Sequence, residues 1–250
     1  LDPFFMKKYG IRGVAIASSI SDIATTVLYG SLLIKERLIS LKINNFVKNT
    51  KTMMQRALFV QLKDLSYQGL YFTVNQKLLL LDTLGKISVS HVLLTKYFYI
   101  NSILFYSLSS AAIVIIPFQK VLQQDVKLTS NRFIYWSVVC SLLQISLLTM
   151  GKQTFSFLTN DEVVLQHIWK VLPIMSLIIP LNAVSTVLDG ILQGINHYRI
   201  QFVNALTSLG IVLLLTRYFT NLSQIWLTFS GLTLIRGVRS YMKYRSLTND

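Results

Sequence analysis

The sequence has few charged side chains for its length. Only 14% of its 250 residues are Asp, Glu, Lys or Arg, whereas a soluble globular domain has about 25%. Hydrophobic residues make up 52% of the chain, and the mean hydropathy is +0.53. This composition excludes an ordinary soluble domain and indicates an integral membrane protein.

Cysteine and the motifs of common enzymes are also scarce. Cys140 is the single cysteine, which excludes an intrachain disulfide and any Cys-x-x-Cys metal motif. The chain has no P-loop, nucleophile elbow or HExxH motif, and its three histidines are far apart. We therefore expect a protein that is not an enzyme and that uses no metal or organic cofactor.

Acidic residues are fewer than basic ones, with 10 Asp and Glu against 24 Lys and Arg and a net charge of +14. Such an excess can serve nucleic-acid binding. Here, however, the basic residues form short clusters between apolar runs, without a nucleic-acid-binding motif. This pattern is typical of residues that flank membrane spans, so we expect a lipid bilayer and no nucleic acid as partner.

Seven segments are long and apolar enough to cross a bilayer, which takes about 20 residues as a helix. Helices are expected because an open strand edge would leave backbone groups unpaired in lipid. The predicted fold class is therefore an all-α, polytopic membrane protein with about seven transmembrane helices. The expected spans are residues 13–34, 57–81, 89–118, 133–151, 171–194, 200–216 and 222–240.

Lys and Arg are distributed unevenly between these spans. Successive spans run in opposite directions, so the segments that connect them lie on the two sides of the membrane in turn. The segments expected on one side include 35–56, 119–132 and the C-terminal tail, and they contain more Lys and Arg than those on the other side. Cytoplasmic loops are enriched in Lys and Arg. We therefore expect the more basic segments, with the C-terminus, on the cytoplasmic side, and we assign Arg236 and Arg239 to the tail.

The fifth span carries an acid near the end of a long uncharged run. At 3.6 residues per turn, Asn182, Thr186, Asp189 and Gln193 lie along one face. Polar groups in hydrocarbon normally face a bundle interior or an aqueous cavity, so this stripe is a candidate cavity wall. Asp189 has two interpretations: a carboxylate that couples transport to a cation, or a helix-end acid that makes a structural hydrogen bond.

Two glycines follow this acid in the same span. Gly190 and Gly194 have the GxxxG spacing, on a face turned about 100° from Asp189. Without side chains, such a face lets another helix approach closely. We therefore expect these glycines to serve helix packing.

The second and third spans offer polar and aromatic side chains that suit a cavity for amphipathic organic cations, through carboxylate and cation–π contacts. These candidates are Asp64, Gln68, Tyr71 and Asn75 in the second span and His91 and Tyr99 in the third. In the first span, Asp22 is a lone acid, and an intramembrane acid is a functional candidate by default. Asp189, Asp64 and Asp22 are thus the candidate cation-coupling residues.

Several stretches resemble markers of one transporter family. PLNAVSTVLDGILQGINHYR, residues 180–199, resembles the tenth helix of the multidrug and toxic compound extrusion (MATE) family, above all its DinF-like branch. Four further stretches resemble family markers in family order: LDP with GIRGVAIASSIS near the start, residues 85–116, FLTNDEVV at 157–164 and IWLTFSGLTLIRGVRS at 225–240.

The resemblance implies a secondary transporter whose two six-helix lobes enclose a V-shaped cavity. Such a protein exports organic small molecules by alternating access, as an antiporter driven by H⁺ or Na⁺. His91 falls at the family's eighth-helix histidine. Asp189 falls at the tenth-helix acid, which the sodium-linked branch ties to cation binding. The sodium-linked branch also has a Glu in its seventh helix. The equivalent position in this chain falls near Gly69, so Asp189 has no such second acid to support a coupling role.

By the same resemblance, the chain corresponds to the sixth to twelfth helices. Residues 1–34 would be the last helix of the N-terminal lobe, 35–56 a basic cytoplasmic inter-lobe loop, and 57–250 the C-terminal six-helix lobe. We then expect a C-terminal fragment that needs a missing N-terminal lobe for a complete cavity. The sequence leaves open the substrate, the choice of H⁺ or Na⁺, and whether the membrane is a plasma membrane or a plastid envelope.

Two alternatives remain. One is a lipid-linked oligosaccharide flippase or polysaccharide exporter of the same superfamily, which would line its path with several basic residues. Within the expected spans the sequence offers Lys63, Lys77 and Lys96. The other is a non-transporting structural membrane subunit.

Overall fold

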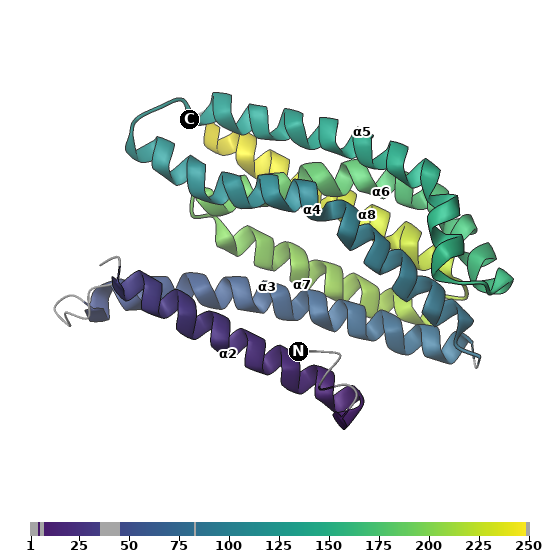
Figure 1. The fold of residues 1–250 in the computed structure, drawn as a ribbon. Coiled ribbons are helices and arrows are strands. Elements are labelled where there is room, and N and C mark those ends of the chain that lie inside the picture. The colour runs from purple at the N-terminus through teal and green to yellow at the C-terminus, as the bar shows by residue number, and fades with distance from the viewer. Residues whose placement is uncertain (1–4, 6–7, 36–45, 83, 249–250) are drawn as a thin grey trace. The chain divides into compact units, whose positions relative to one another are not determined.

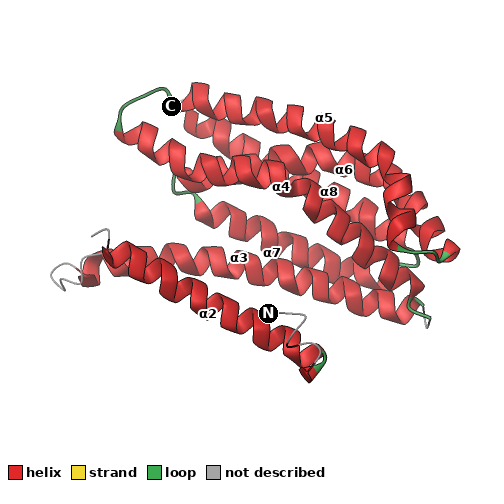
Figure 2. Ribbon diagram, viewed as in Figure 1, coloured by secondary structure: helices red, strands yellow, loops and turns green. Residues whose placement is uncertain are grey.

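The computed structural model describes residues 5, 8–35, 46–82 and 84–248. Over these residues the chain is helical with short connections and has no strand (Figure 2), which confirms the all-α expectation. The helices extend beyond most of the predicted spans. They are α2 (Ile11–Lys35), α3 (Phe46–Leu81), α4 (Lys86–Val121), α5 (Val126–Leu158), α6 (Glu162–Gly194), α7 (Tyr198–Leu215), the 3₁₀ turn η1 (Thr216–Tyr218) and α8 (Leu222–Thr248).

The chain divides into two compact units, Leu1–Met53 and Met54–Asp250. The smaller unit contains α2 and the first residues of α3, and the larger unit contains the rest of α3 and all later helices. The expected loop at 35–56 includes the first turns of α3, since this helix begins at Phe46 and not near residue 57. Residues 36–45 of that loop lie outside the described residues.

Helix starts in the larger unit follow local capping signals. The Asp125 carboxylate accepts a hydrogen bond from the backbone N–H of Leu128 at 3.0 Å, just before α5. Asp161 accepts hydrogen bonds from the backbone N–H groups of Val163 and Val164, just before α6. An N-cap carboxylate satisfies N–H groups that lack an intrahelical partner. These caps begin the helices several residues before the apolar runs, so α5 and α6 are longer than the spans predicted from hydropathy.

Helix α6 is the centre of the larger unit and packs against α4, α5 and α8 (Figure 1). In its most apolar stretch 61% of the residues are buried, compared with 28% in α4 and 22% in α5. A helix that is apolar on all sides is expected to lie inside a bundle. The sequence of α6, uncharged from Val171 to Leu188, therefore determines its central place.

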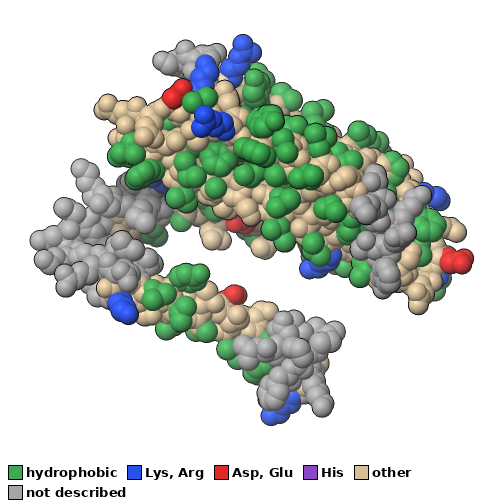
Figure 3. Space-filling view, turned by 45° about the horizontal axis from the view of Figure 1, so that its top comes forward, with side chains coloured by type: hydrophobic (Ala, Val, Ile, Leu, Met, Phe, Trp, Pro, Cys, Tyr) green, Lys and Arg blue, Asp and Glu red, His purple; other side chains and the backbone are tan. Residues whose placement is uncertain are grey.

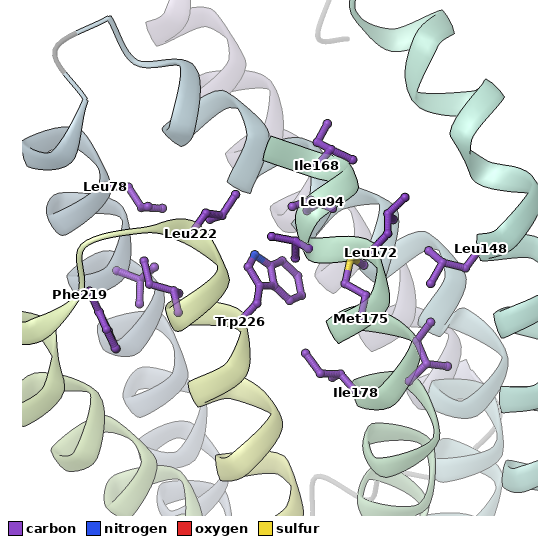
Figure 4. Close-up of a cluster of buried hydrophobic side chains, with 14 of the residues drawn as sticks. Leu78, Leu94, Leu148, Ile168, Leu172, Met175, Ile178, Phe219, Leu222 and Trp226 are labelled. Atoms are coloured by element: carbon purple, nitrogen blue, oxygen red, sulfur yellow. The ribbon is translucent and has the colours of Figure 1, made fainter. Parts of the chain in front are cut away.

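Two apolar clusters lie along α6. The first contains Leu78, Leu94, Met175 and Trp226, which come from α3, α4, α6 and α8 (Figure 4). The second contains Phe105, Ile116, Val187, Ile191 and Tyr244. Because each cluster draws side chains from several helices, together they hold the larger unit as one packed bundle.

The outer surface of the bundle suits a lipid environment. Large apolar side chains such as Leu80, Val121 and Leu214 are exposed, and hydrophobic side chains cover much of the face in Figure 3. Among the described helices, α4, α5, α6 and the α7–η1 segment contain stretches long and apolar enough to cross a membrane. The chain is therefore a multi-pass integral membrane protein. The expected spans in α2, α3 and α8 are not among these four, and α3 and α8 carry charged side chains within their apolar runs.

Candidate functional site

A cavity of about 410 Å³ opens within the larger unit, between α3, α4, α6, α7 and α8. This volume lies in the range of small-molecule sites, which is about 300–1,000 Å³. Its lining combines aromatic and aliphatic side chains with a few polar ones. The lining residues are Asp64, Tyr67, Gln68, Leu70, Tyr71, Thr95, Phe98, Tyr99, Tyr106, Ile178, Asn182, Ser208, Trp226, Phe229, Leu232, Thr233 and Arg236.

Aromatic rings from three helices meet along this cavity. Tyr71 of α3 lies 6.2 Å from Tyr99 of α4 and 6.3 Å from Phe229 of α8, measured between ring centroids. Trp226 makes an edge-to-face contact with Phe229 at 5.9 Å, and Figure 4 shows its indole among apolar side chains of the first cluster. Such rings offer faces for apolar or aromatic ligands and for organic cations.

Arg236 of α8 is the most connected polar residue of the cavity wall. Its Nη1 donates a hydrogen bond to the Tyr67 hydroxyl at 3.1 Å. Its Nη2 donates to Oδ1 of Asn182 at 2.8 Å and to the Thr186 hydroxyl at 3.4 Å. The guanidinium therefore joins α3 and α6 to α8, with only 14% of its side chain exposed.

Asp189 supplies the counter-charge. Its Oδ2 lies 3.9 Å from Nε of Arg236, an ion pair too long for a hydrogen bond. Its Oδ1 accepts a hydrogen bond from the Ser240 hydroxyl at 3.0 Å, and its backbone carbonyl accepts one from the Gln201 amide. Asp189 thus connects α6 to both α7 and α8, as a structural acid would, and it also neutralises a charge at the cavity wall.

Two buried donors at this end of the cavity have no hydrogen-bond partner among the described residues. They are Nε of Arg236 and the side-chain N–H₂ of Asn182, and both residues line the cavity. Buried polar groups in proteins nearly always have a partner, in the protein, in water or in a ligand. The site can therefore accept a ligand or water that offers acceptor atoms.

Several predicted cavity residues do meet at this site. Asp64, Gln68, Tyr71, Tyr99 and Asn182 line it. Thr186 and Asp189 lie behind the wall and contact it through Arg236.

Other predicted candidates lie elsewhere. Asn75 and Gln193 are not among the lining residues, and Asn75 is exposed. His91 is buried against Trp226 and Phe229, with ring centroids 5.8 Å and 6.3 Å away. It therefore supports the aromatic wall from behind. Asp22 belongs to α2 in the smaller unit, where its side chain is exposed.

Asp64 is only partly available to a ligand. Its Oδ1 lies 3.4 Å from Nζ of the adjacent Lys63, and 51% of its side chain is exposed. At such exposure an ion pair is weak, because water screens the charges and the long lysine side chain must be held in one geometry. The Asp64 carboxylate can therefore exchange its lysine partner for a ligand cation at little cost.

The glycines of α6 lie against α4. A Cβ atom on Gly190 would lie 2.5 Å from the backbone oxygen of Ser109, and one on Gly194 would lie 3.1 Å from that of Ala112. A third glycine, Gly237 of α8, lies against α6, since its Cβ would lie 2.5 Å from the Ser185 hydroxyl. Glycine at these positions therefore allows α6 to lie this close to α4, and α8 to lie this close to α6.

Arg236 is the functional candidate that the sequence interpretation missed. The rule for basic loops predicts a cytoplasmic tail at this position, but α8 continues to Thr248 and places Arg236 inside the bundle. A signal was present, since Phe229, Thr233, Arg236 and Ser240 recur at helical spacing on one face. Among the described residues no group of three His, Cys, Asp or Glu side chains is arranged to hold a metal ion.

Comparison with known proteins identifies the bundle. A family model, MatE, matches residues 77–219, which is more than half of the chain. Neither the comparison with curated proteins nor that with solved structures gave a match. The matched segment contains the whole of α4, α5, α6 and α7, and with them Asn182, Thr186 and Asp189. The chain belongs to the MatE family of membrane transporters.

Proposed function

We propose that this MatE-family protein is a cation-coupled antiporter that exports amphipathic organic cations by alternating access. One observation carries the proposal: a single cavity combines an aromatic wall, the weakly held carboxylate of Asp64 and Arg236, whose charge is paired with Asp189 behind the wall. The aromatic rings suit the apolar body of a substrate, and the carboxylate suits its charge.

The proposed coupling follows from the charge of Arg236. While Asp189 is ionised, it compensates the guanidinium at 3.9 Å, and the cavity wall is close to neutral. When H⁺ or Na⁺ binds at Asp189, the charge of Arg236 is no longer balanced and repels a cationic substrate. Substrate and coupling ion then occupy the site alternately, as antiport requires.

The flippase alternative is less well supported. A path for phosphate-bearing lipids needs several basic side chains, and Arg236 is the one basic residue among those that line the described cavity. Its charge is also matched by Asp189. A structural subunit without transport activity is distinguished by the efflux test that follows, in which neither gradient would drive efflux.

The test measures efflux of an aromatic fluorescent cation, ethidium, from membrane vesicles that contain the protein, under an imposed H⁺ or Na⁺ gradient. We expect one gradient to drive efflux. Asp189→Asn should remove this dependence, because an amide cannot take up the ion, and Asp64→Asn should weaken the apparent affinity for ethidium. The control Glu162→Gln changes an exposed acid that is not among the lining residues and should leave efflux intact.

Gradient-driven efflux that is the same with Asp189→Asn would contradict the coupling role. Absence of efflux under either gradient, in vesicles where the protein is inserted and folded, would contradict the antiporter itself.

We also propose that the C-terminus lies on the cytoplasmic side, as the basic loops suggest. The exposed basic residues Lys120, Lys127, Arg199 and Arg245 lie at the end of the larger unit where α8 ends. A protease-sensitive tag after Asp250 should therefore be protected in sealed cells, and its cleavage from outside would reverse the assignment.

A further inference from the structure

A second cavity lies at the end of the bundle, apart from the proposed transport site. It has a volume of about 300 Å³. Its residues come from the end of α4, the start of α5, the end of α6 with the following turn, and the end of α8. They are Lys120, Val126, Lys127, Ser130, Ile191, Ile195, His197, Tyr244 and Leu247, and we call this site the end cavity.

Two tight turns bring the basic residues of the end cavity together. The α4–α5 turn is closed by hydrogen bonds from the Leu122 and Gln124 N–H groups and by the Asp125 cap, so Lys120 and Lys127 flank it. In the α6–α7 turn, Asn196 has a φ of 71° and the His197 N–H donates to the Leu192 carbonyl at 2.8 Å. This closure ends α6 and places His197 at the cavity.

The floor of the end cavity is apolar. Ile191 is fully buried in the second apolar cluster, and Val126, Ile195 and Leu247 pack against the same cluster. Lys120 and Lys127 are exposed and His197 is half-buried. The cavity therefore combines an apolar floor with a positively charged opening.

No acid among the lining residues balances these charges. Burial, followed by the positive charges of Lys243 and Lys120, lowers the pKa of His197 below its ordinary value. The nearby Asp125 uses its carboxylate to cap α5. Lys120 of α4 and Lys243 of α8 thus place positive charges near His197, and Lys127 of α5 lines the same cavity, an arrangement that a bound anion would stabilise.

We propose that the end cavity binds an anionic phospholipid of the surrounding leaflet. The lipid phosphate would contact Lys120, Lys127 and His197, and one acyl chain would lie over Val126, Ile195 and Leu247. The apolar floor favours a lipid over a free phosphate, which would leave it uncovered. Exposed apolar residues at the same turn, Val121 at 80% and Leu122 at 50%, suit contact with the bilayer.

This inference does not depend on the proposed transport function. The test counts phosphatidylglycerol molecules bound to the purified full chain by native mass spectrometry, after reconstitution in phosphatidylcholine with increasing phosphatidylglycerol. Lys120→Gln with Lys127→Gln should weaken binding by about 30-fold, because each lysine contributes about 1 kcal/mol near an anionic surface. The matched control, Lys170→Gln with Arg217→Gln, removes two exposed basic residues that lie outside this cavity and should retain binding.

A second measurement does not rely on the double variant. Protonation of His197 adds a positive charge toward the phosphate, so binding should strengthen as the pH falls through the lowered pKa of this imidazole. The other ionisable groups around His197 are Lys120, Lys127 and Tyr244 of the cavity lining, Lys243 of α8, and Asp125 of the α4–α5 turn, which lies near Tyr244. His197→Gln should remove the pH dependence.

Two results would overturn the proposal. Equal weakening by both double variants would show that general surface charge, and not this cavity, holds the lipid. Displacement of phosphatidylglycerol by soluble glycerol phosphate at similar concentration would show a site for a free phosphate group without any role for the acyl chain.

Discussion

The two ends of α6 each carry an aspartate paired with a basic residue of another helix, but in different surroundings. Before the first turn, Asp161 lies 3.0 Å from Lys86, with the two side chains 36% and 34% exposed. Near the last turn, Asp189 lies 3.9 Å from Arg236, with 17% and 14% exposed. Water screens the shorter pair, whereas each charge of the longer pair depends on the other in a medium of low polarity. The pair with the shorter distance is therefore the one whose loss should destabilise the protein less.

The largest expected effect is at the buried end. Arg236→Gln leaves the Asp189 carboxylate without a counter-charge, and loss of one partner of a buried pair costs about 3–5 kcal/mol. The double variant Asp189→Asn with Arg236→Gln removes both charges and should recover most of this loss. Denaturant unfolding of the detergent-solubilised protein measures both. If the two variants are equally destabilised, the ion pair is not what holds this end of α6.

A smaller loss is expected from Gly190→Ala, next to Asp189. The added Cβ would meet the backbone oxygen and the hydroxyl of Ser109 at 2.5 Å, so α4 and α6 must separate. Overpacking of this kind costs about 1–3 kcal/mol. The control Gly231→Ala, on an exposed face of α8 with no atom within 4 Å, should be neutral or slightly stabilising. Equal stability of the two variants would show that α4 yields easily at Ser109.

The smallest effect is expected at the exposed end. The hydrogen bond from Lys86, followed by those from the Val164 and Val163 N–H groups, lowers the pKa of Asp161 below its ordinary value. A lowered pKa adds stability above the unfolded-state pKa near 3.9, and this stability is lost as the pH falls through the folded-state value. Asp161→Asn should therefore reduce the melting temperature slightly at pH 7 and have no such effect in strong acid. An equal reduction at both pH values would assign the effect to the amide's poorer capping and not to charge.

The sequence allowed the helices and part of the site to be predicted. Apolar runs of bilayer length located the helices, and helical spacing placed Asn182 and Thr186 on one face, where both contact Arg236. Spacing within α3 likewise placed Asp64, Gln68 and Tyr71 together at the cavity. These predictions succeed because they depend on the geometry of a single helix.

The missing part depends on contacts between helices. Arg236 follows an apolar run. An arginine at such a position can begin a loop or be buried in the bundle, and the surrounding sequence is the same in both cases. Its burial is determined by acceptors on other helices, α3 and α6. His91 matched a family position but lies behind the aromatic wall, because α4 presents that face to Trp226. The start of α3 at Phe46 was missed because hydropathy reports the bilayer-long part of a helix and not its polar extension.

The close approach of α6 to its neighbours limits how the proposed transport cycle can proceed. Gly190 holds α6 against α4, where the Ser109 hydroxyl donates to the Thr186 carbonyl, and Gly237 holds α8 against α6, where the Ser185 hydroxyl donates to the Thr233 carbonyl. Such close contacts, joined by hydrogen bonds between the helices, resist sliding, so in the proposed cycle we expect α4, α6 and α8 to move as one rigid body. Arg236 and Asp189 both belong to that body, and their backbones keep a constant separation throughout. If the proposed coupling operates, a change in the charge that the substrate meets then comes from ion uptake or side-chain rotation, and not from a change in the distance between α6 and α8.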